Sequence, residues 1–458
     1  MKMQLNACAK AVNGQLVGDD VLITSVSIDT RAIVSGQLYI AIKGQNFDGN
    51  QFVDQAQQSG AVAAIVEWGV ETSLPHITVD NTRLALAEIA SAWRRSLSQG
   101  DNSLSVVGVT GSNGKTTVKE MVAAILAVNE SVLYTQGNLN NDIGVPLTLL
   151  RLDESYRYAV IEMGANHAEE IRYTSQYAQA DVVVITNAGA AHLEGFGSLD
   201  GVAKAKGEII ETLKADGIVI INKDDVYFRY WQSVAGKRTV SSFGLSADAD
   251  VSAQKVRTGI SQNHFLTTFE LVTKQGVIEI NLSLAGQHNV VNALAATAAS
   301  LALGIDIKQI KQGLESLKPV TGRMQPLVGR LGNIIIDDTY NANSASLKAG
   351  LDVLSQLDGK PWLVLGAFGE LGPQSAKIHE DMAEMIKLSG VERLFAVGAD
   401  AKKTVEAFGL GADFYEDQEV LIAELKKQLK GDETILIKGS RARRMENVAA
   451  ALVENFRN

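Results

Sequence analysis

The sequence predicts an α/β protein of three domains, built around parallel sheets that helices cover on both faces. Its length of 458 residues corresponds to roughly three domains of ~150 residues each. Short apolar runs rich in valine and isoleucine alternate with longer helical patterns, as expected for parallel strands that are buried on both faces. Forty-one glycines and only six prolines favour many tight strand-to-helix turns and few rigid linkers.

The three domains are predicted at residues 1–82, 83–317 and 318–458. The first is a small N-terminal α/β domain, with a strand at 36–43 and a helix followed by a strand at 51–67. The second is a central domain with a parallel sheet, which its glycine-rich loop at residues 110–117 assigns to the P-loop ATPase type. The third is a doubly wound, Rossmann-like domain. The strands expected in the last two domains are residues 105–109, 158–163, 181–186, 217–222, 333–337, 362–365, 393–397 and 434–437.

The charge and the cysteine content of the chain argue against several classes of protein. The chain has 42 lysines and arginines against 52 aspartates and glutamates, a formal net charge of −10. A generally basic nucleic-acid binder is therefore disfavoured, because an acidic surface repels phosphate. The single cysteine, Cys8, excludes an intrachain disulfide and a zinc site of several thiolates, and we expect it to be partly buried. No apolar run reaches the ~18 residues of a membrane span, so we predict a soluble, cytoplasmic protein.

The most informative local feature is a glycine-rich loop at residues 110–117 (TGSNGKTT), which follows an apolar strand and precedes a helical pattern. In such a loop, backbone N–H groups and the Lys115 ammonium converge on a polyphosphate, and the Thr116 hydroxyl ligates Mg²⁺. Val109 occupies the first glycine position of the general pattern G-x-x-x-x-G-K-[ST]. The alternative is a glycine-rich turn with a solvated lysine, but the flanking strand and helix favour nucleotide binding. The predicted nucleotide-binding residues of the loop are Thr110, Gly111, Ser112, Asn113, Gly114, Lys115, Thr116 and Thr117.

This loop variant resembles that of the Mur ligases, which are ATP-dependent, amide-forming enzymes of peptidoglycan synthesis. The resemblance covers nearly the whole chain, and several motifs in one order are far more specific than the loop alone. Within the family, the motifs are most similar to those of members that use D-alanyl-D-alanine. The further stretches are residues 138–146 (NLNNDIGVP), 162–167 (EMGANH), 192–197 (HLEGFG), 337–343 (DDTYNAN) and 438–441 (KGSR).

The resemblance implies a reaction in two stages, with ATP, UDP-N-acetylmuramoyl-tripeptide and D-alanyl-D-alanine as substrates. ATP phosphorylates the terminal carboxylate of the tripeptide, and the amine of the dipeptide then attacks the acyl phosphate. Residues 1–82 are expected to receive the UDP-sugar, residues 83–317 to bind ATP, and residues 318–458 to close over both and bind the dipeptide. We expect a monomer with no nucleic-acid partner, whose cleft closes when ligands bind.

Four residues are the expected catalytic groups: Lys115, Glu162, His192 and Lys206. Glu162 ends a predicted strand at the edge where open sheets bind ligands, and its carboxylate suits Mg²⁺; the alternative is a surface glutamate. By resemblance, His192 and a carbamylated Lys206 are further Mg²⁺ ligands. Otherwise a loop histidine is a hydrogen-bonding residue, and the lysine is a solvated helix residue. Lys204 and Lys206 cannot share a helix face, and the spacing from His192 favours Lys206.

The resemblance also places four residues beside ATP. Asn289 and Asn292 are expected near the adenine, and Arg323 and Asp338 are expected to reach the nucleotide across the cleft from the third domain. The alternatives are polar caps on a packed, alanine-rich helix for the two asparagines and a helix cap for the aspartate.

Five further residues are expected to contact the other substrates. Ser27 and Arg31 belong to the part that resembles the UDP-sugar site, where an arginine suits a diphosphate because charge-assisted hydrogen bonds are strong. Asn140 lies in one of the family stretches, and Lys438 and Arg441 near the end of the chain suit anionic substrate groups. A solvated basic cluster is the alternative for the last two.

The sequence is also compatible with other functions. One is a different amide ligase of the same architecture, either another amino-acid-adding Mur ligase or a folylpolyglutamate synthase, and residues 338–343 disfavour both by resemblance. A nucleotide-regulated binding protein does not need the catalytic set, and a phosphate-loop motor needs an oligomer interface. Asn50, Ser344 and Ala367 depart from residues common in the family. The last of these departures leaves the contacts to the dipeptide open.

Overall fold

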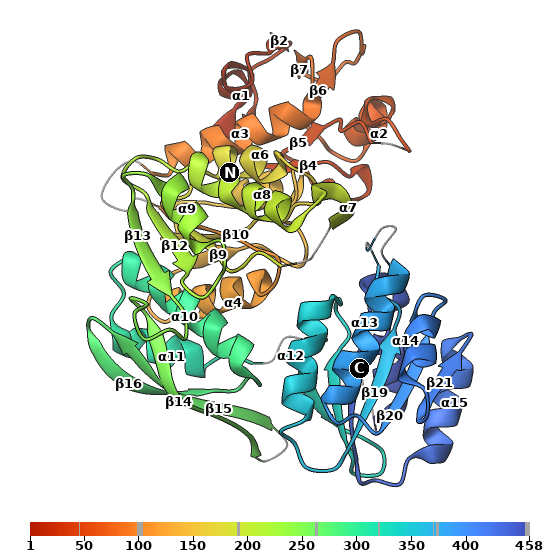
Figure 1. Cartoon of the computed structure of the whole chain (residues 1–458). Helices are drawn as coiled ribbons and strands as arrows, with labels where there is room; N and C mark the ends of the chain where they lie inside the picture. Colours follow the sequence, from red (N-terminus) through yellow and green to blue (C-terminus); the bar gives the residue numbers. More distant parts are fainter. Residues whose placement is uncertain are drawn as a thin grey trace.

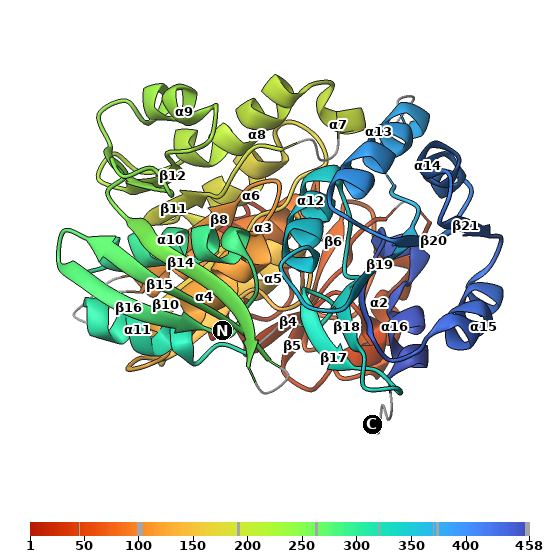
Figure 2. The same cartoon turned by 60° about the horizontal axis from the view of Figure 1, so that its bottom comes forward.

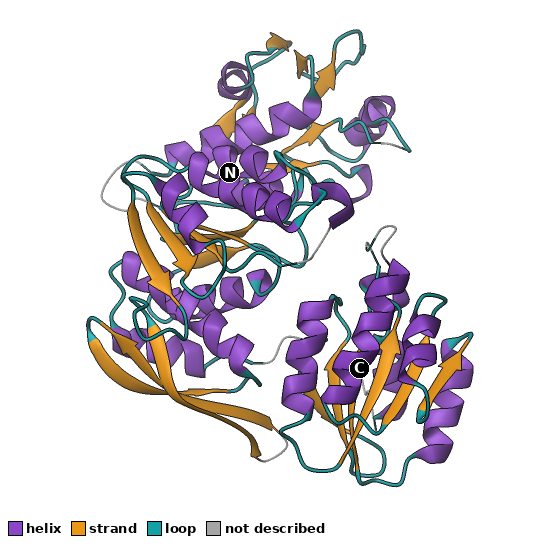
Figure 3. Ribbon diagram, in the orientation of Figure 1, coloured by secondary structure: helices purple, strands orange, loops and turns teal. Residues whose placement is uncertain are grey.

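The computed structural model of the chain describes residues 1–44, 46–98, 104–189, 193–261, 264–318, 321–369, 371 and 375–453. These residues form three α/β units in succession, as predicted (Figure 1). Each unit has its own sheet with helices beside it (Figure 3). Among the described helices, none is long and apolar enough to cross a membrane.

The first unit is built on a five-stranded sheet in the order β2-β7-β6-β5-β4. Strands β4 to β7 are parallel and β2 is antiparallel to β7, while β1 and β3 form a separate antiparallel pair. The predicted strand at 36–43 is β5, and the helix and strand at 51–67 are α2 and β6. The elements are β1 Met3–Gln4, α1 Leu5–Ala11, β2 Gln15–Val17, β3 Leu22–Ile23, β4 Ser25–Ser27, β5 Gln37–Ile40, α2 Val53–Gln58, β6 Ala63–Glu67 and β7 His76–Val79.

Cys8 lies on α1 and has no exposed surface. The prediction that it is partly buried is therefore wrong, because α1 packs this small side chain into the core beside Leu5 and Ile23. Burial raises the pKa of the Cys8 thiol to about 12. The thiol is thus held in its neutral, unreactive form.

Helix α3 (Thr82–Ser96) links the first unit to the central unit. The Asn81 side chain caps it by accepting hydrogen bonds of 3.0 Å from the N–H groups of Arg83 and Leu84. The helix packs against α1 of the first unit and against α5 (Gly144–Leu149) and α6 (Glu170–Ala178) of the central unit. The predicted boundary at 82/83 therefore falls at the start of a helix that both units share.

The central unit contains a six-stranded parallel sheet in the order β13-β12-β11-β8-β10-β9. Alternate residues of a strand enter opposite cores: on β11, Val182 and Val184 pack on one face, and Val183 and Ile185 pack on the other. Both faces are buried, which is why the strands are continuously apolar. The strands are β8 Ser105–Thr110, β9 Val132–Tyr134, β10 Tyr158–Glu162, β11 Val182–Ile185, β12 Ile218–Asn222 and β13 Thr239–Phe243.

Helices cover both faces of this sheet. Helices α6, α8 and α9 contribute to one core, and α4, α10 and α11 contribute to the other. An antiparallel sheet of β14, β15 and β16 packs beside α10 and α11 (Figure 2); it was not predicted. The remaining elements are α4 Lys115–Leu126, α7 Leu193–Phe196, α8 Leu199–Glu211, α9 Phe228–Ala235, β14 Ser252–Ser261, β15 His264–Thr273, β16 Gly276–Leu282, α10 Gln287–Ala302 and α11 Ile307–Glu315.

The described residues of the C-terminal unit form a second six-stranded sheet, in the order β17-β18-β22-β19-β20-β21. Strand β17 is antiparallel to β18, and the other pairs of this sheet are parallel. The four predicted strands are β18, β19, β20 and β22. Helix α12 faces the central unit (Figures 1 and 2). The elements are β17 Gln325–Val328, β18 Ile334–Asp338, α12 Ser344–Leu354, β19 Lys360–Gly366, α13 Ser375–Leu388, β20 Arg393–Val397, α14 Ala401–Phe408, β21 Ala412–Tyr415, α15 Gln418–Gln428, β22 Glu433–Lys438 and α16 Glu446–Leu452.

Candidate functional site

The glycine-rich loop connects β8 to α4, as predicted. Gly111 and Gly114 have φ values of +145° and +82°, which only glycine adopts readily. Each is also closely packed: a Cβ on Gly111 would lie 1.9 Å from Thr186 Oγ1, and a Cβ on Gly114 would lie 2.3 Å from Asn292 Oδ1. Both glycines are therefore required by backbone conformation and by space.

The segment after β11 holds the loop in place. Asn187 accepts hydrogen bonds of 3.0 Å from the N–H of Ser112 at its carbonyl oxygen and from the N–H of Asn113 at Oδ1. Thr186 Oγ1 donates to the Asn113 carbonyl oxygen at 2.6 Å. No side chain of the described part of the chain caps α4, so the first N–H groups of this helix are available to an anion.

Lys115 begins α4 and folds back over the loop. Its Nζ donates to the carbonyl oxygens of Gly111 at 2.6 Å and Ser112 at 3.3 Å. Burial lowers the pKa of the Lys115 amine; the Glu162 carboxylate opposes this shift, and the Arg323 guanidinium adds to it. The ammonium thus sits above the loop, where a phosphate group would compete for it.

Glu162 lies at the carboxyl end of β10, in the strand next to β8, and only 2% of its surface is exposed. Asn140 Nδ2 donates to Oε1 at 2.9 Å, and the Glu162 N–H donates to Thr135 Oγ1 at 3.0 Å. The second carboxylate oxygen, Oε2, is buried and has no hydrogen-bond partner among the described residues. A buried carboxylate with one unpaired oxygen fits a metal cation. Asn140, predicted as a substrate residue, is the group that orients this carboxylate.

Lys206 lies on the buried face of α8, whereas Lys204 is exposed, which confirms that only one of the two points inward. The Lys206 Nζ is 5.3 Å from the centre of the Phe196 ring. Burial, followed by the positive charge of Lys115, lowers the pKa of Lys206 to about 7. A large fraction of this amine is therefore neutral near neutral pH. His192, the other predicted ligand, lies outside the described residues.

Helix α10 brings Asn289 and Asn292 to the loop. Asn289 Nδ2 donates to the Ala285 carbonyl oxygen at 2.8 Å, and Asn292 Nδ2 donates to Asn289 Oδ1 at 3.2 Å. Both side chains are buried, and Asn292 abuts Gly114 at the start of α4. The two predicted adenine residues thus form one hydrogen-bonded pair beside the phosphate loop.

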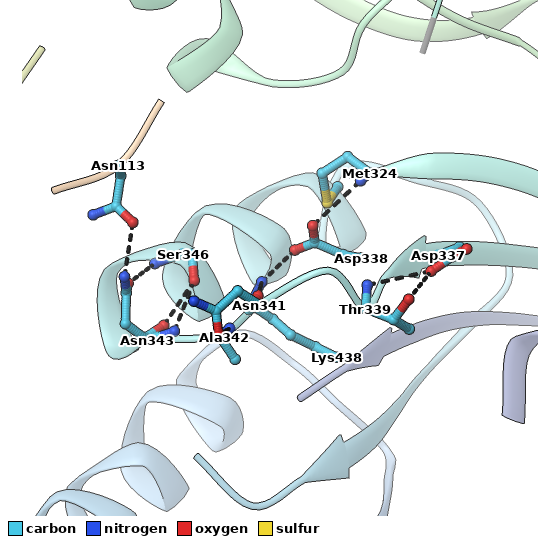
Figure 4. Close-up of polar contacts among 10 residues, drawn as sticks. All are labelled: Asn113, Met324, Asp337, Asp338, Thr339, Asn341, Ala342, Asn343, Ser346 and Lys438. Atoms are coloured by element: carbon cyan, nitrogen blue, oxygen red, sulfur yellow. Dashed lines mark hydrogen bonds and ion pairs between the residues drawn. The ribbon is translucent and has the colours of Figure 1, made fainter. Parts of the chain in front are cut away.

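Asp338 and Lys438 end the neighbouring strands β18 and β22 of the C-terminal unit. Lys438 Nζ donates to Asp338 Oδ2 at 2.5 Å and to the Asn341 carbonyl oxygen at 3.2 Å, and the Met324 N–H donates to Asp338 Oδ1 at 3.3 Å (Figure 4). Lys438 is almost fully buried. This lysine, predicted to hold a substrate anion, neutralises Asp338 in the structure.

Among the described residues, two hydrogen bonds join the C-terminal unit to the phosphate loop. Arg323 Nη2 donates to Thr116 Oγ1 at 3.1 Å, and its guanidinium carbon lies 4.1 Å from the centre of the Tyr340 ring. Asn343 Nδ2 donates to Asn113 Oδ1 at 2.7 Å (Figure 4). The residues that meet here are 207 and 230 positions apart. The pairing of Asn343 with the loop was not predicted from the sequence.

The remaining predicted residues are Arg441, Ser27 and Arg31. The guanidinium carbon of Arg441 lies 5.6 Å from the centre of the Tyr340 ring, which also contacts Arg323. Arg441 forms an ion pair of 3.4 Å with Glu446. In the first unit, Ser27 Oγ donates to the Asp29 carbonyl oxygen at 3.0 Å, and Arg31 binds both Asp29 carboxylate oxygens, at 2.9 and 2.6 Å. Arg31 lowers the pKa of Asp29 to about 2, and its side chain is 84% exposed. The arginine is thus held in place and open to an anion.

This geometry defines a class of protein: a phosphate-loop, nucleotide-dependent enzyme whose site is completed by a second α/β unit. The central unit supplies the loop, the buried Glu162 and Lys206. The C-terminal unit delivers a guanidinium to the loop through Arg323. No group of three or more His, Cys, Asp and Glu side chains that could hold a metal occurs within the described ranges, which exclude His192.

Comparison with known proteins identifies the family. The models "Mur ligase family, catalytic domain", "Mur ligase middle domain" and "Mur ligase, glutamate ligase domain" match residues 22–94, 109–300 and 322–441. The chain belongs to the Mur ligase family, whose enzymes are ATP-dependent amide ligases. This membership favours a ligase over the binding protein and the motor.

Curated relatives match over the full length of the chain. The UDP-N-acetylmuramoyl-tripeptide–D-alanyl-D-alanine ligase of Escherichia coli (strain K12) is 43% identical over 99% of both chains. The Haemophilus influenzae protein of the same name is 40% identical over 100% of both chains.

Solved structures give the same result. A crystal structure of MurF from Acinetobacter baumannii has a TM-score of 0.92 and 35% identity over 99% of both chains. MurF from Thermotoga maritima in complex with ADP has a TM-score of 0.83 and 29% identity, covering 93% of this chain and 96% of that chain.

Proposed function

We propose that this enzyme joins D-alanyl-D-alanine to UDP-N-acetylmuramoyl-tripeptide at the expense of ATP, giving the pentapeptide, ADP and phosphate. The observation that carries the proposal is the 43% identity, over 99% of both chains, with the Escherichia coli ligase of that name. The likeness to a diaminopimelate ligase, a pseudomurein peptide ligase and a folylpolyglutamate synthase, at 18–20% identity, shows the fold alone. The diaminopimelate-adding and folylpolyglutamate alternatives are therefore less well supported.

The chemistry requires activation of a carboxylate, which is a poor electrophile. In the proposed first step, a carboxylate oxygen of the tripeptide attacks the γ-phosphorus of ATP and ADP leaves. In the second step, the dipeptide amine attacks the acyl carbon, loses a proton and expels phosphate. Negative charge accumulates on the transferred group, and Lys115 and Arg323 are the cations placed at the loop to stabilise it.

The residues beside the loop fit Mg²⁺. We assign Thr116 Oγ1 and the unpaired Oε2 of Glu162 as oxygen ligands, with His192 as a further predicted ligand. When bound, Mg²⁺ would neutralise charge on the ATP phosphates. Arg323 Nη2 donates to the Thr116 hydroxyl in the structure, which leaves the second lone pair of this oxygen for the metal.

We also propose carbamylation of Lys206. Only a neutral amine adds to carbon dioxide, a step that forms a C–N bond and releases one proton. The buried Lys206, with its pKa lowered to about 7, meets this condition. The product is an anionic carbamate with oxygen atoms suited to Mg²⁺.

The remaining residues are assigned to ATP or to the other substrates. Asn289 and Asn292 are proposed to bind the adenine, and Asp338 to contact ATP from the C-terminal unit. Ser27 and Arg31 are proposed to bind the UDP-sugar, because Arg31 offers an exposed guanidinium. Further substrate contacts are proposed for Asn140, Lys438 and Arg441. The domain boundaries, the monomeric state and the cytoplasmic location stay predictions.

The test is a product assay by mass spectrometry. Purified enzyme is incubated with ATP, Mg²⁺, UDP-N-acetylmuramoyl-tripeptide and either D-alanyl-D-alanine or a different amine, with tripeptides ending in lysine and in diaminopimelate. We expect pentapeptide from D-alanyl-D-alanine and one of the tripeptides. Acceptance of another amine, with no pentapeptide from D-alanyl-D-alanine, would refute the specific assignment.

A further inference from the structure

The carboxamide group of Asn343 forms hydrogen bonds with two different units of the protein. It is the N-terminal cap of α12: its Oδ1 accepts a hydrogen bond of 2.9 Å from the Ser346 N–H, and its own N–H donates to Ser346 Oγ at 3.0 Å. Its Nδ2 donates to Asn113 Oδ1 in the phosphate loop at 2.7 Å (Figure 4). One side chain therefore joins the start of a C-terminal helix to the nucleotide loop of another unit.

The orientation of both carboxamides follows from the cap. Because Asn343 Oδ1 must accept from a backbone N–H, Nδ2 is the atom that points toward the loop, and it can only donate. Asn113 must then present its oxygen. The main chain of Asn113 is held separately, by Asn187 and Thr186. Among the described residues of the central unit, the side chain of Asn113 has no hydrogen-bond partner; its partner is Asn343 of the C-terminal unit.

A second contact holds α12 against the central unit. A Cβ on Gly286, at the start of α10, would lie 2.8 Å from Val353 Cγ2 near the end of α12. Val353 and Asn343 are ten positions apart, about 15 Å along a helix. Helix α12 therefore touches the central unit at both ends, and α10 itself contacts the loop through Asn292 and Gly114.

We propose that Asn343 is a positioning residue that couples the phosphate loop to the placement of the C-terminal unit. Because Asn343 both caps α12 and donates to Asn113, a displacement of Asn113 would move the start of this helix. Occupation of the loop by nucleotide and closure of the C-terminal unit are thereby linked through one hydrogen bond. The inference deepens the proposed function, on which its activity measurements rest.

The test is a double-mutant cycle with Asn113→Ala, Asn343→Ser and the double variant. Serine caps a helix as well as asparagine but carries no amide donor, and alanine at 113 keeps the main-chain bonds to Asn187 and Thr186. We expect each single variant to lower kcat/KM for ATP about threefold to tenfold, the effect of one hydrogen bond. We expect the double variant to be no worse than the poorer single variant.

Two further measurements separate positioning from folding. Asn343→Ser should melt at the wild-type temperature, whereas Asn343→Ala, which also loses the cap, should melt at a lower one. Solution scattering of the ligand-free enzyme, which needs no substrate, should show a larger radius of gyration for Asn113→Ala and Asn343→Ser than for the wild type.

Additive losses in the cycle, or unchanged activity and dimensions in both single variants, would overturn the inference. These outcomes are distinct from failure of the proposed function, in which the unsubstituted enzyme itself makes no pentapeptide while the scattering difference persists.

Discussion

Replacement of Lys206 by methionine tests how the buried amine titrates. Methionine keeps an unbranched side chain of similar length but carries no charge. Only 2% of the surface of Lys206 is exposed, and burial, with Lys115 as the second cause, lowers its pKa to about 7. In the unfolded chain the same amine titrates near its ordinary value of about 10.4.

The sign of the effect follows from proton binding. Between about pH 7 and about pH 10, the unfolded chain holds a proton on Lys206 that the folded chain has largely released, so stability rises with pH. Burial of the Lys206 amine lowers the free energy of unfolding. This destabilisation is fully present below the pKa of Lys206 in the folded protein and disappears as the pH approaches its pKa in the unfolded chain. The slope approaches about 1.4 kcal/mol per pH unit. From about pH 7.5 to about pH 9, the wild type should therefore gain about 2 kcal/mol relative to Lys206→Met.

Urea unfolding at the two pH values measures this difference. Unfolding is followed by the fluorescence of the four tryptophans. One of them, Trp231, donates from Nε1 to the Ala203 carbonyl oxygen of α8 at 3.0 Å. Carbon dioxide is removed from the buffers so that the Lys206 amine does not form a carbamate. Lys204→Met is the matched control, since Lys204 is exposed on the same helix, and it should follow the wild type. A stability difference between wild type and Lys206→Met that stays constant with pH would refute the reasoning.

Three further outcomes are expected. Lys115→Ala should lower the rate of pentapeptide formation about a hundredfold to a thousandfold, because it removes a cation at the transferred phosphoryl group; an undiminished rate contradicts this role. Glu162→Gln should raise the Mg²⁺ concentration required for half-maximal rate about tenfold or more, since it neutralises the carboxylate whose Oε2 is unpaired, and an unchanged requirement argues against a ligand. Solution scattering should show smaller dimensions when ATP and UDP-N-acetylmuramoyl-tripeptide are added together, and equal dimensions argue against ligand-induced closure.

Much of the fold is predictable because both large sheets are buried on both faces. A strand such as β11 shows four consecutive apolar residues, Val182 to Ile185, all of them buried, and this pattern is visible without knowledge of the fold. The antiparallel sheet of β14 to β16 escapes prediction for the opposite reason. It buries Phe265 and Phe269 but exposes Leu266 and Val277, so its strands carry many polar residues and no continuous apolar run.

The candidate site divides in the same way. The phosphate loop is a local feature of consecutive residues, and its conformation depends on glycines at fixed spacing, so the sequence is sufficient to locate it. Helical geometry also predicts that only one of Lys204 and Lys206 faces inward, and the spacing from His192 favoured Lys206. The pairing of Asn140 with Glu162 and the use of Lys438 to neutralise Asp338 depend instead on how neighbouring strand ends are placed.

The sequence by itself determined the order of the three α/β units, the position of the phosphate loop and the family whose motifs the chain carries. These properties depend on residues close together in the chain, where spacing dictates conformation. Only the tertiary structure decided that Arg323 meets Thr116 and that Asn343 meets Asn113. Those contacts join residues more than two hundred positions apart, and they depend on how separately formed units pack against each other, which no local pattern encodes.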